Sequence, residues 1–323
     1  MDFKKVVPII GIIILFYILS TMDLVKIVHI FADINKIYGL LSALAIYPIL
    51  LIVNLEWQLI LKKHNINVSY WYSLKNLFIG YFYGFITPGG VGGYASAFYL
   101  RDKSGESIHK CFVNLLIFFT VDYLSLISIG IFGGLLIINI YPNILPILVI
   151  LFLIEIALLI LFIRKNTGQQ IYQKIIKSNF LSRYKEKFDN HFEKLYVDIP
   201  RIIDLIPASF VSFFGWLLWF SELYFISILF SINVPYHYFI ITVAIASVIG
   251  SIPITFKGLG TREATLIGLF SFFSIPQENV VAFSLFWFFT SWLIPSLIGS
   301  IVTIRESRKN PDLPKNLKIF NKK

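Results

Sequence analysis

The segment GFITPGGVGGYASAFYLRDK, residues 84–103, decides the fold because it interrupts an otherwise apolar part of the chain. Four glycines and a proline fall between Pro88 and Gly93, and the first charged residue of the segment is Arg101. A second segment of this kind, ITFKGLGTREATLIGLF, occupies residues 254–270 and includes charged residues. Glycine weakens a helix through its conformational freedom, and proline removes a backbone donor. Both segments are therefore predicted to turn where a regular helix would otherwise continue, and in the first a short helix is predicted to start near Gly92.

The composition indicates an integral membrane protein. Of the 323 residues, 57% are hydrophobic and only 14% are charged, whereas a soluble globular chain has about 25% charged residues. The net charge of +10 is carried by clusters between apolar runs, which favours contact with anionic lipid headgroups over nucleic acid. The single cysteine and the five scattered histidines form no metal-binding motif, and no P-loop sequence occurs. We expect no metal, no cofactor and no nucleic-acid partner.

The apolar runs predict an all-α polytopic bundle with about six full spans and two re-entrant helical hairpins. The first run lacks a signal-peptide cleavage site, so we expect it to be retained. The predicted full spans are 6–22, 37–61, 111–138, 144–163, 206–230 and 280–304. The predicted hairpins pair 68–87 with 91–100, and 237–256 with 258–273.

The distribution of basic residues predicts the orientation. Five regions hold 24 of the 28 lysines and arginines, and the positive-inside rule places such regions in the cytoplasm. The predicted location is therefore the cell membrane, with multiple spans and with both termini cytoplasmic. The two hairpins must then enter from opposite faces. Together with the spacing of GVG at 90–92 and GLG at 258–260, this predicts an inverted repeat, a common device of transporters.

The chain is expected to form one transmembrane domain, 1–305, followed by a basic cytoplasmic tail, 306–323. The repeat halves are predicted at about 37–138 and 206–304. Between them, residues 164–205 combine lysines with apolar residues at roughly helical spacing. This pattern predicts an amphipathic segment on the cytoplasmic face.

Irregular backbone at membrane depth is tolerated only where protein buries it or where it lines a wet cavity. The two glycine segments are therefore candidate binding elements, although close helix packing through small residues would also explain Gly92 and Gly93. Charged residues inside a membrane are costly, by roughly 2.5–3.5 kcal/mol each on insertion scales, so they too are candidates. The complete set of predicted substrate-binding residues is Pro88, Gly89, Gly90, Gly92, Gly93, Lys257, Gly258, Gly260, Arg262, Glu263, Asp122, Glu222 and Glu56.

The roles of the charged candidates stay open at this point. Lys257 and Arg262 can hold a phosphate or another anion. Arg262 and Glu263 can equally neutralise each other. The remaining acids, Glu56, Asp122 and Glu222, can balance charge, bind a cationic group, carry a coupling proton or pair with Arg262. No nucleophile–base pair or metal cluster occurs, so we do not expect an enzyme.

Three further residues inside apolar runs are weaker candidates. Glu155 is expected to be a structural partner or to lie near a membrane boundary. The aromatic residues Tyr94 and Trp219 can line a substrate path, and a lipid-facing position is an equal alternative for each. The sequence does not separate these roles.

These motifs resemble the membrane region of lysylphosphatidylglycerol synthases, a group that includes many stand-alone prokaryotic membrane proteins with a flippase-like domain. The resemblance covers most of residues 5–305 and is carried by TPGGVGGYASAFYLRDKSGES and PITFKGLGTREATLIGLFSFFSIP. In the bifunctional synthases this region is implicated in moving aminoacylated phospholipid between leaflets, and a separate soluble domain makes that lipid. About 20 residues follow the last predicted span, so we expect no such domain there, and the resemblance does not imply aminoacyl transfer.

Three functions are compatible with these patterns. The first, which the resemblance favours, is a lipid translocase whose hairpins shelter a headgroup; its partners are membrane lipids with an anionic headgroup. The second is a non-catalytic membrane partner of a separate lipid-modifying or glycosyl-transfer enzyme, docking through 164–205. The third is a small-solute transporter with the same architecture.

Overall fold

The computed structural model describes residues 13–136, 144–163, 196–252, 255 and 257–309, and these ranges contain helices but no strand. The predicted all-α class is confirmed. The described helices are Ile13–Ser20, α2 (Leu24–Asp33), α3 (Lys36–Lys63), α4 (Tyr70–Phe85), η1 (Pro88–Ala95), α5 (Ser96–Ser104), α6 (Ile108–Leu136), α7 (Ile144–Ile163), η3 (Ile202–Leu205), α10 (Ile206–Leu229), α11 (Tyr236–Ser251), α12 (Thr261–Phe270), η4 (Ser271–Phe273), α13 (Gln277–Phe288), η5 (Phe289–Leu293) and α14 (Ile294–Lys309).

Four helical stretches in the described residues are long and apolar enough to cross a membrane: Lys36–Lys63, Ile108–Leu136, Ile202–Leu229 and Gln277–Lys309. A fifth candidate is the pair Ile13–Ser20 and α2, which is bent by 89°. α7 is apolar but shorter over its hydrophobic part. The molecule is thus polytopic, whereas the count of six spans remains a prediction. The predicted first span, 6–22, begins in residues outside the described ranges.

Local sequence signals account for several helix boundaries. The side chain of Asn35 accepts hydrogen bonds from the backbone N–H groups of Ile37 and Tyr38, which caps α3 at its start. At the other end of α3, Lys62 and Lys63 lie where a positive charge is favourable for the helix dipole. Ser69 caps α4 in the same way as Asn35 caps α3.

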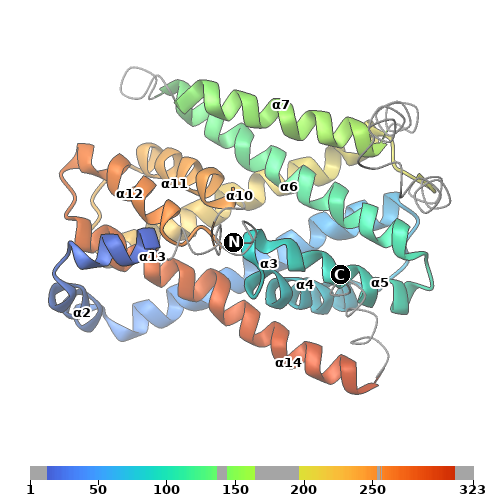
Figure 1. The fold of residues 1–323 in the computed structure, drawn as a ribbon, viewed down its shortest axis with the longest axis horizontal. Coiled ribbons are helices and arrows are strands. Elements are labelled where there is room, and N and C mark those ends of the chain that lie inside the picture. Colours follow the sequence, from blue (N-terminus) through green and yellow to red (C-terminus); the bar gives the residue numbers. More distant parts are fainter. Residues whose placement is uncertain (1–12, 137–143, 164–195, 253–254, 256, 310–323) are drawn as a thin grey trace, which may run out of the picture.

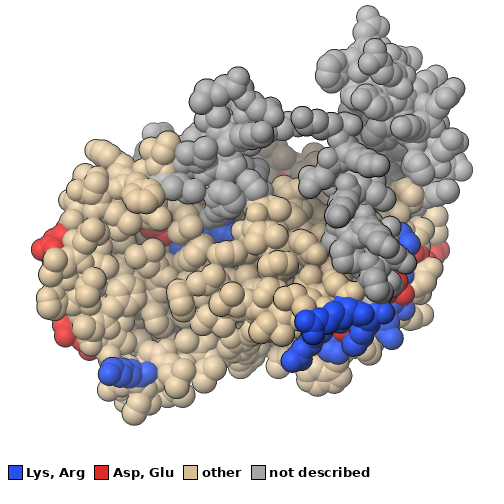
Figure 2. All heavy atoms as spheres, turned by 60° about the horizontal axis from the view of Figure 1, so that its bottom comes forward, with Lys and Arg blue, Asp and Glu red and all other residues tan. Residues whose placement is uncertain are grey.

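The surface has the apolar character that a membrane requires. Large hydrophobic side chains are exposed along the long helices, among them Leu40 on α3, Phe214 on α10 and Leu297 on α14. On the face shown in Figure 2, lysines and arginines gather mainly at one end of the molecule, and most of the surface between the ends carries no charge. An apolar outer surface on a packed bundle is expected where lipid, and not water, is the surrounding solvent.

Each glycine segment follows one helix and leads into a second helix that packs back on the first. η1 lies against α4, and α5 contacts both α4 and α6. In the second segment, α12 lies against α11. Figure 1 shows α4 and α5 at one end of the long helices, and α11 and α12 at the other. The two hairpins therefore lie at opposite ends of the long helices. Their entry from opposite faces of the membrane and their relation by an inverted repeat remain predictions.

The structure corrects one local detail of the first hairpin. The sequence predicts a turn up to Gly92 and a short helix after it, but the glycines lie inside the 3-10 helix η1, which continues directly into α5. Pro88 occupies the first turn of η1, where its missing N–H costs no helical hydrogen bond. The glycine-rich stretch is thus compact helical structure and not an open loop.

Two other predictions lie largely outside the described residues. The amphipathic segment predicted for 164–205 falls mainly in the range 164–195, and only its end is described, as an irregular stretch and η3. The basic tail, 306–323, is described only up to Lys309, where α14 ends.

Candidate functional site

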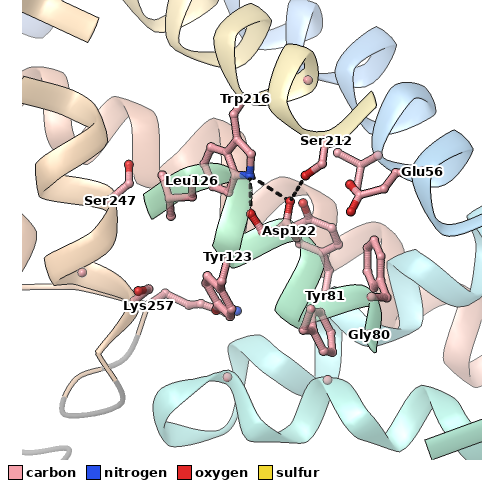
Figure 3. A pocket seen from close by; sticks show the side chains of 18 of the residues that line it. Glu56, Gly80, Tyr81, Asp122, Tyr123, Leu126, Ser212, Trp216, Ser247 and Lys257 are labelled. Atoms are coloured by element: carbon pink, nitrogen blue, oxygen red, sulfur yellow. Dashed lines mark hydrogen bonds between the residues drawn. The ribbon is translucent and has the colours of Figure 1, made fainter. Parts of the chain in front are cut away.

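The two glycine segments line one cavity of about 470 Å³ in the middle of the molecule. Gly90 and Gly93 face it from the first segment, and Lys257 and Arg262 face it from the second. Residues of α3, α4, α6, α7, α10, α11 and the α13–η5 helix complete the lining, as Figure 3 shows in part. A concave space reached by convergent polar groups is the expected form of a ligand site.

In the first segment, close backbone packing requires glycine. Thr87 donates a hydrogen bond from Oγ1 to the carbonyl oxygen of Tyr83 at 2.8 Å and accepts one from the N–H of Gly92 at 2.7 Å. A Cβ atom on Gly92 would collide with that same carbonyl and with the Thr87 side chain. Gly90 adopts φ of +71°, which glycine tolerates without strain. Pro88 and Gly89 are described here only through the backbone of η1.

In the second segment, three residues within four positions have positive φ. The values are +50° for Lys257, +78° for Gly258 and +87° for Gly260. A Cβ atom on Gly258 would lie 2.9 Å from the Cα of Gly250 on α11. Lys257 is a non-glycine residue in this left-handed region, which is uncommon and signals local strain. Its side chain points into the cavity, as Figure 3 shows.

Arg262 and Glu263, which lie on the first turn of α12, form a buried ion pair at 2.8 Å. Arg262 also donates to the hydroxyl and the carbonyl oxygen of Ser284 on α13, at 3.0 and 3.1 Å. Glu263 accepts hydrogen bonds from the Ser284 hydroxyl and from the N–H of Gly260. The guanidinium also lies 4.5 Å from the ring centre of Trp287. Through these contacts with Ser284, the ion pair holds α12 against α13.

The amine of Lys257 has a different environment. Among the described residues, no carboxylate lies within 4.0 Å of its Nζ atom, and Nζ makes no hydrogen bond to them. Nζ lies 4.4 Å from the ring centre of Trp292 in η5, a cation–π contact. It also reaches the first segment, because a Cβ built on Gly90 would lie only 2.9 Å from it. Lys257 therefore connects the two hairpins and carries a cation that lacks an anionic partner within the described chain.

The tryptophan beneath Lys257 comes from an irregular helix. η5 is a π-helix of five residues between α13 and α14, and such segments are often found at functional sites. The ring of Trp292 lies 5.6 Å from the ring of Tyr81 and 6.1 Å from that of Trp219. Trp219 in turn stacks on Trp216. The cavity thus has an aromatic wall that sequence patterns alone did not identify as a unit.

Two predicted acids lie together on another wall of the cavity. Asp122 on α6 accepts hydrogen bonds from Trp216 Nε1 at 2.8 Å and from Ser212 at 3.3 Å. Glu56 on α3 lies beside Asp122, with Ser212 next to both (Figure 3). Glu56 is only 1% exposed, and its Oε1 atom has no hydrogen-bond partner among the described residues. Neither acid forms an ion pair with Arg262, whose carboxylate partner is Glu263.

Glu222 is separate from this group. It is 8% exposed on α10, and neither of its carboxylate oxygens has a hydrogen-bond partner in the described part of the chain. It does not line the cavity. Of the predicted site residues, those that line the cavity are Gly90, Gly93, Lys257, Arg262, Asp122 and Glu56. Gly92, Gly258 and Gly260 do not line it, and Glu263 is the structural partner of Arg262. Within the described residues, no group of three potential metal ligands occurs.

The weaker candidates also lie at the cavity. Tyr94 of η1 and Trp219 of α10 both line it, and Trp219 is buried. Their position along a substrate path remains a prediction. Glu155 of α7 lines the cavity too.

Several contributors to the site carried little signal in the sequence. Trp287 and Trp292 line the cavity, and Ser284 completes the Arg262 pair. The concentration of tryptophan in 287–292 was a visible signal for part of this set. Nothing in the sequence pointed to the hydroxyl of Ser284, because its partner lies on another helix.

Together, the polytopic helical fold and the cavity between two glycine hairpins define the class of protein. The chain matches the family described as Lysylphosphatidylglycerol synthase TM region over residues 6–299, and it belongs to that family. It is also similar to two archaeal proteins named UPF0104 membrane protein. The one from Methanothermobacter thermautotrophicus is 28% identical over 281 residues, covering 79% of this chain and 80% of the relative. The one from Pyrococcus horikoshii is 23% identical over 300 residues, covering 86% and 89%.

Proposed function

We propose that this protein is a lipid translocase that moves a lipid with an anionic headgroup between the membrane leaflets. The observation that carries the proposal is the cavity itself, which both glycine hairpins line and which contains the Lys257 cation, unpaired among the described residues. A buried cation without a counter-ion is unfavourable. An incoming phosphate group would place an anion in direct contact with this amine, which no carboxylate of the described residues reaches.

The hairpins provide the geometry that such a transfer needs. They approach the cavity from opposite ends of the long helices (Figure 1), and Lys257 of one contacts the backbone region of Gly90 in the other. We infer that they form the two arms of an inverted repeat and that the headgroup passes between them. In transporters of this kind the substrate site lies near the membrane midplane, at the interface between the repeats.

We further propose that the protein lies in the cell membrane with both termini in the cytoplasm. The ends of α5 and α14 carry Arg101, Lys103, Arg308 and Lys309, and Figure 1 shows these two ends on the same side of the molecule. Lys62 and Lys63 end α3, and the positive-inside rule assigns such a basic end to the cytoplasm. We infer a transport role and not an enzymatic one.

Transfer can be measured in proteoliposomes that contain a trace of phosphatidylglycerol with a fluorescent acyl chain. A membrane-impermeant reductant bleaches only the outer leaflet, so additional bleaching reports translocation. We expect wild-type protein to increase the bleached fraction and Lys257→Met to abolish the increase. The matched control is Lys36→Met, which removes an exposed lysine at the start of α3. No increase by the wild-type protein would contradict the proposal.

An assay with a soluble anion distinguishes lipid translocation from the alternative of small-solute transport. Soluble glycerol phosphate presents the same anion without acyl chains. A lipid translocase should transfer the fluorescent lipid in the presence of this solute, and radiolabelled glycerol phosphate should not accumulate in the vesicles. Accumulation of the solute, without lipid transfer, would favour a solute transporter.

A further inference from the structure

The acids Glu56 and Asp122 form a second feature of the cavity, which the binding of an anion does not explain. They come from α3 and α6, and they lie beside each other with no lysine or arginine within 4.0 Å among the described residues. Glu56 is almost fully buried, and its Oε1 atom has no hydrogen-bond partner within the described ranges. Two neighbouring carboxylates that have no cation are stable together only if something neutralises part of their charge.

The surrounding residues narrow the choice of neutralising group. Asp122 receives hydrogen bonds from Trp216 and Ser212 on one of its oxygens. Within the described residues, no third acid, histidine or cysteine joins the pair to form a metal site. A proton held by the pair neutralises part of its charge. The titratable and charged side chains that line the same cavity are Tyr81, Tyr94, Tyr123, Glu155, Lys257 and Arg262.

We propose that Glu56 and Asp122 form a proton-binding pair that takes up one proton with each anionic headgroup and releases it when the headgroup leaves. The proposal rests on the proposed lipid translocation, and it assigns the chemical gradient to which that translocation is coupled. The proton comes from water at the side where the lipid binds and leaves to water at the other side. No covalent bond of the lipid forms or breaks.

Charge balance in the cavity explains the coupling. With one shared proton, the pair carries one negative charge, which offsets the positive charge of Lys257. Arg262 is already neutralised by Glu263. A headgroup that binds beside Lys257 adds a second negative charge, and uptake of another proton by the pair restores neutrality. Glu155, on α7, also lines the cavity and is only partly buried.

The proton pair can be tested without any transport assay. Infrared spectra of the purified full-length protein in lipid contain a carbonyl band wherever a carboxyl group is protonated. We expect this band at neutral pH in the wild type, and we expect it to weaken in both Glu56→Gln and Asp122→Asn. Glu155→Gln is the matched control and should keep the band that the pair produces. A band that neither Glu56→Gln nor Asp122→Asn changes would overturn the pair.

The coupling is then tested in the proteoliposome assay with fluorescent phosphatidylglycerol. In the wild type, acidification of the side on which the lipid starts should accelerate transfer several-fold relative to equal pH on both sides. Glu56→Gln and Asp122→Asn keep the size of the side chains, and their transfer should be independent of the gradient. Transfer by the wild type at the same rate with and without a gradient would overturn the coupling and leave the translocase proposal intact. Absence of any wild-type transfer would refute the translocase proposal, and the infrared band would still decide on the proton pair.

Discussion

The two glycine segments of this protein each form a turn between two helices, and different interactions hold the two turns in place. The first contains no charged residue between Pro88 and Gly93, and hydrogen bonds through Thr87 hold its backbone close to α4. The second is held by the buried pair of Arg262 and Glu263, which connects α12 to α13. One turn is therefore stabilised by neutral close packing and the other by charge. Because Arg262 is paired with Glu263, Lys257 is the cation of the second segment that has no anion among the described residues of the cavity.

The largest effect on stability is expected from Glu263→Ala. This change leaves the guanidinium of Arg262 buried without its anion, and breaking one side of a buried pair costs about 3–5 kcal/mol. Thermal unfolding of the purified protein in detergent would measure the loss. The double variant Arg262→Met/Glu263→Met removes both charges and should recover much of it. Equal unfolding of Glu263→Ala and wild type would show that the charged network does not hold the second turn.

A smaller loss of stability is expected from Gly92→Ala in the first turn. The added methyl group would collide with the Tyr83 carbonyl and the Thr87 side chain, and overpacking of this kind costs about 1–3 kcal/mol. The same unfolding measurement applies. Gly268→Ala on α12 is the matched control, because no atom lies within 4 Å of the position that its added methyl group would take. A stable Gly92→Ala protein would mean that the first turn does not depend on close backbone approach.

The buried side chain of His64 predicts that the stability of the protein depends on pH. His64, directly after α3, is buried and contacts the carbonyl oxygen of Val197 and the side-chain amide of Asn114. Burial lowers the pKa of His64 from 6.5 to about 4. The unfolded chain therefore binds more protons than the folded chain between these two values, so stability falls as the pH falls.

The free energy of unfolding should accordingly decrease by about 1 kcal/mol between roughly pH 7.5 and 5.5, as follows from the linkage of a lowered histidine pKa to stability. Chemical unfolding at a series of pH values would measure it. His64→Asn should remove this part of the pH dependence, whatever its effect at neutral pH. The same slope in the variant and the wild type would assign the pH effect to another group.

The smallest effect on stability is expected from Lys257→Met, the variant that should abolish lipid transfer. Because the amine has no ion-pair partner among the described residues, its removal breaks no pair there and takes a charge out of the cavity. Unfolding temperatures of the variant and the wild type should therefore be similar. A loss as large as that of Glu263→Ala would show that Lys257 is a structural residue like Arg262.

Much of this architecture was predictable from local patterns. Runs of apolar residues predicted the long helices, because their length matches the thickness of a membrane. The glycine segments predicted both reversals of the chain. The entry of the two hairpins from opposite membrane faces, which the distribution of basic residues indicates, remains a prediction. The sequence also identified most charged residues of the cavity, because charges within apolar runs are conspicuous.

The roles of those charges were decided only by the tertiary structure. Arg262 and Lys257 are close in sequence, and both were equal candidates for binding an anion. Arg262 is hydrogen-bonded to Ser284 and forms an ion pair with Glu263. The side chain of Lys257 instead extends toward Gly90 and Trp292. Similarly, Glu56 and Asp122 meet because α3 and α6 place them beside Ser212 of α10 (Figure 3).

The sequence by itself thus determined where the helices run and where they break, since those properties depend on neighbouring residues. Which charge is paired and which stays open to a ligand is a property of contacts between distant helices, and only the packed bundle decides it.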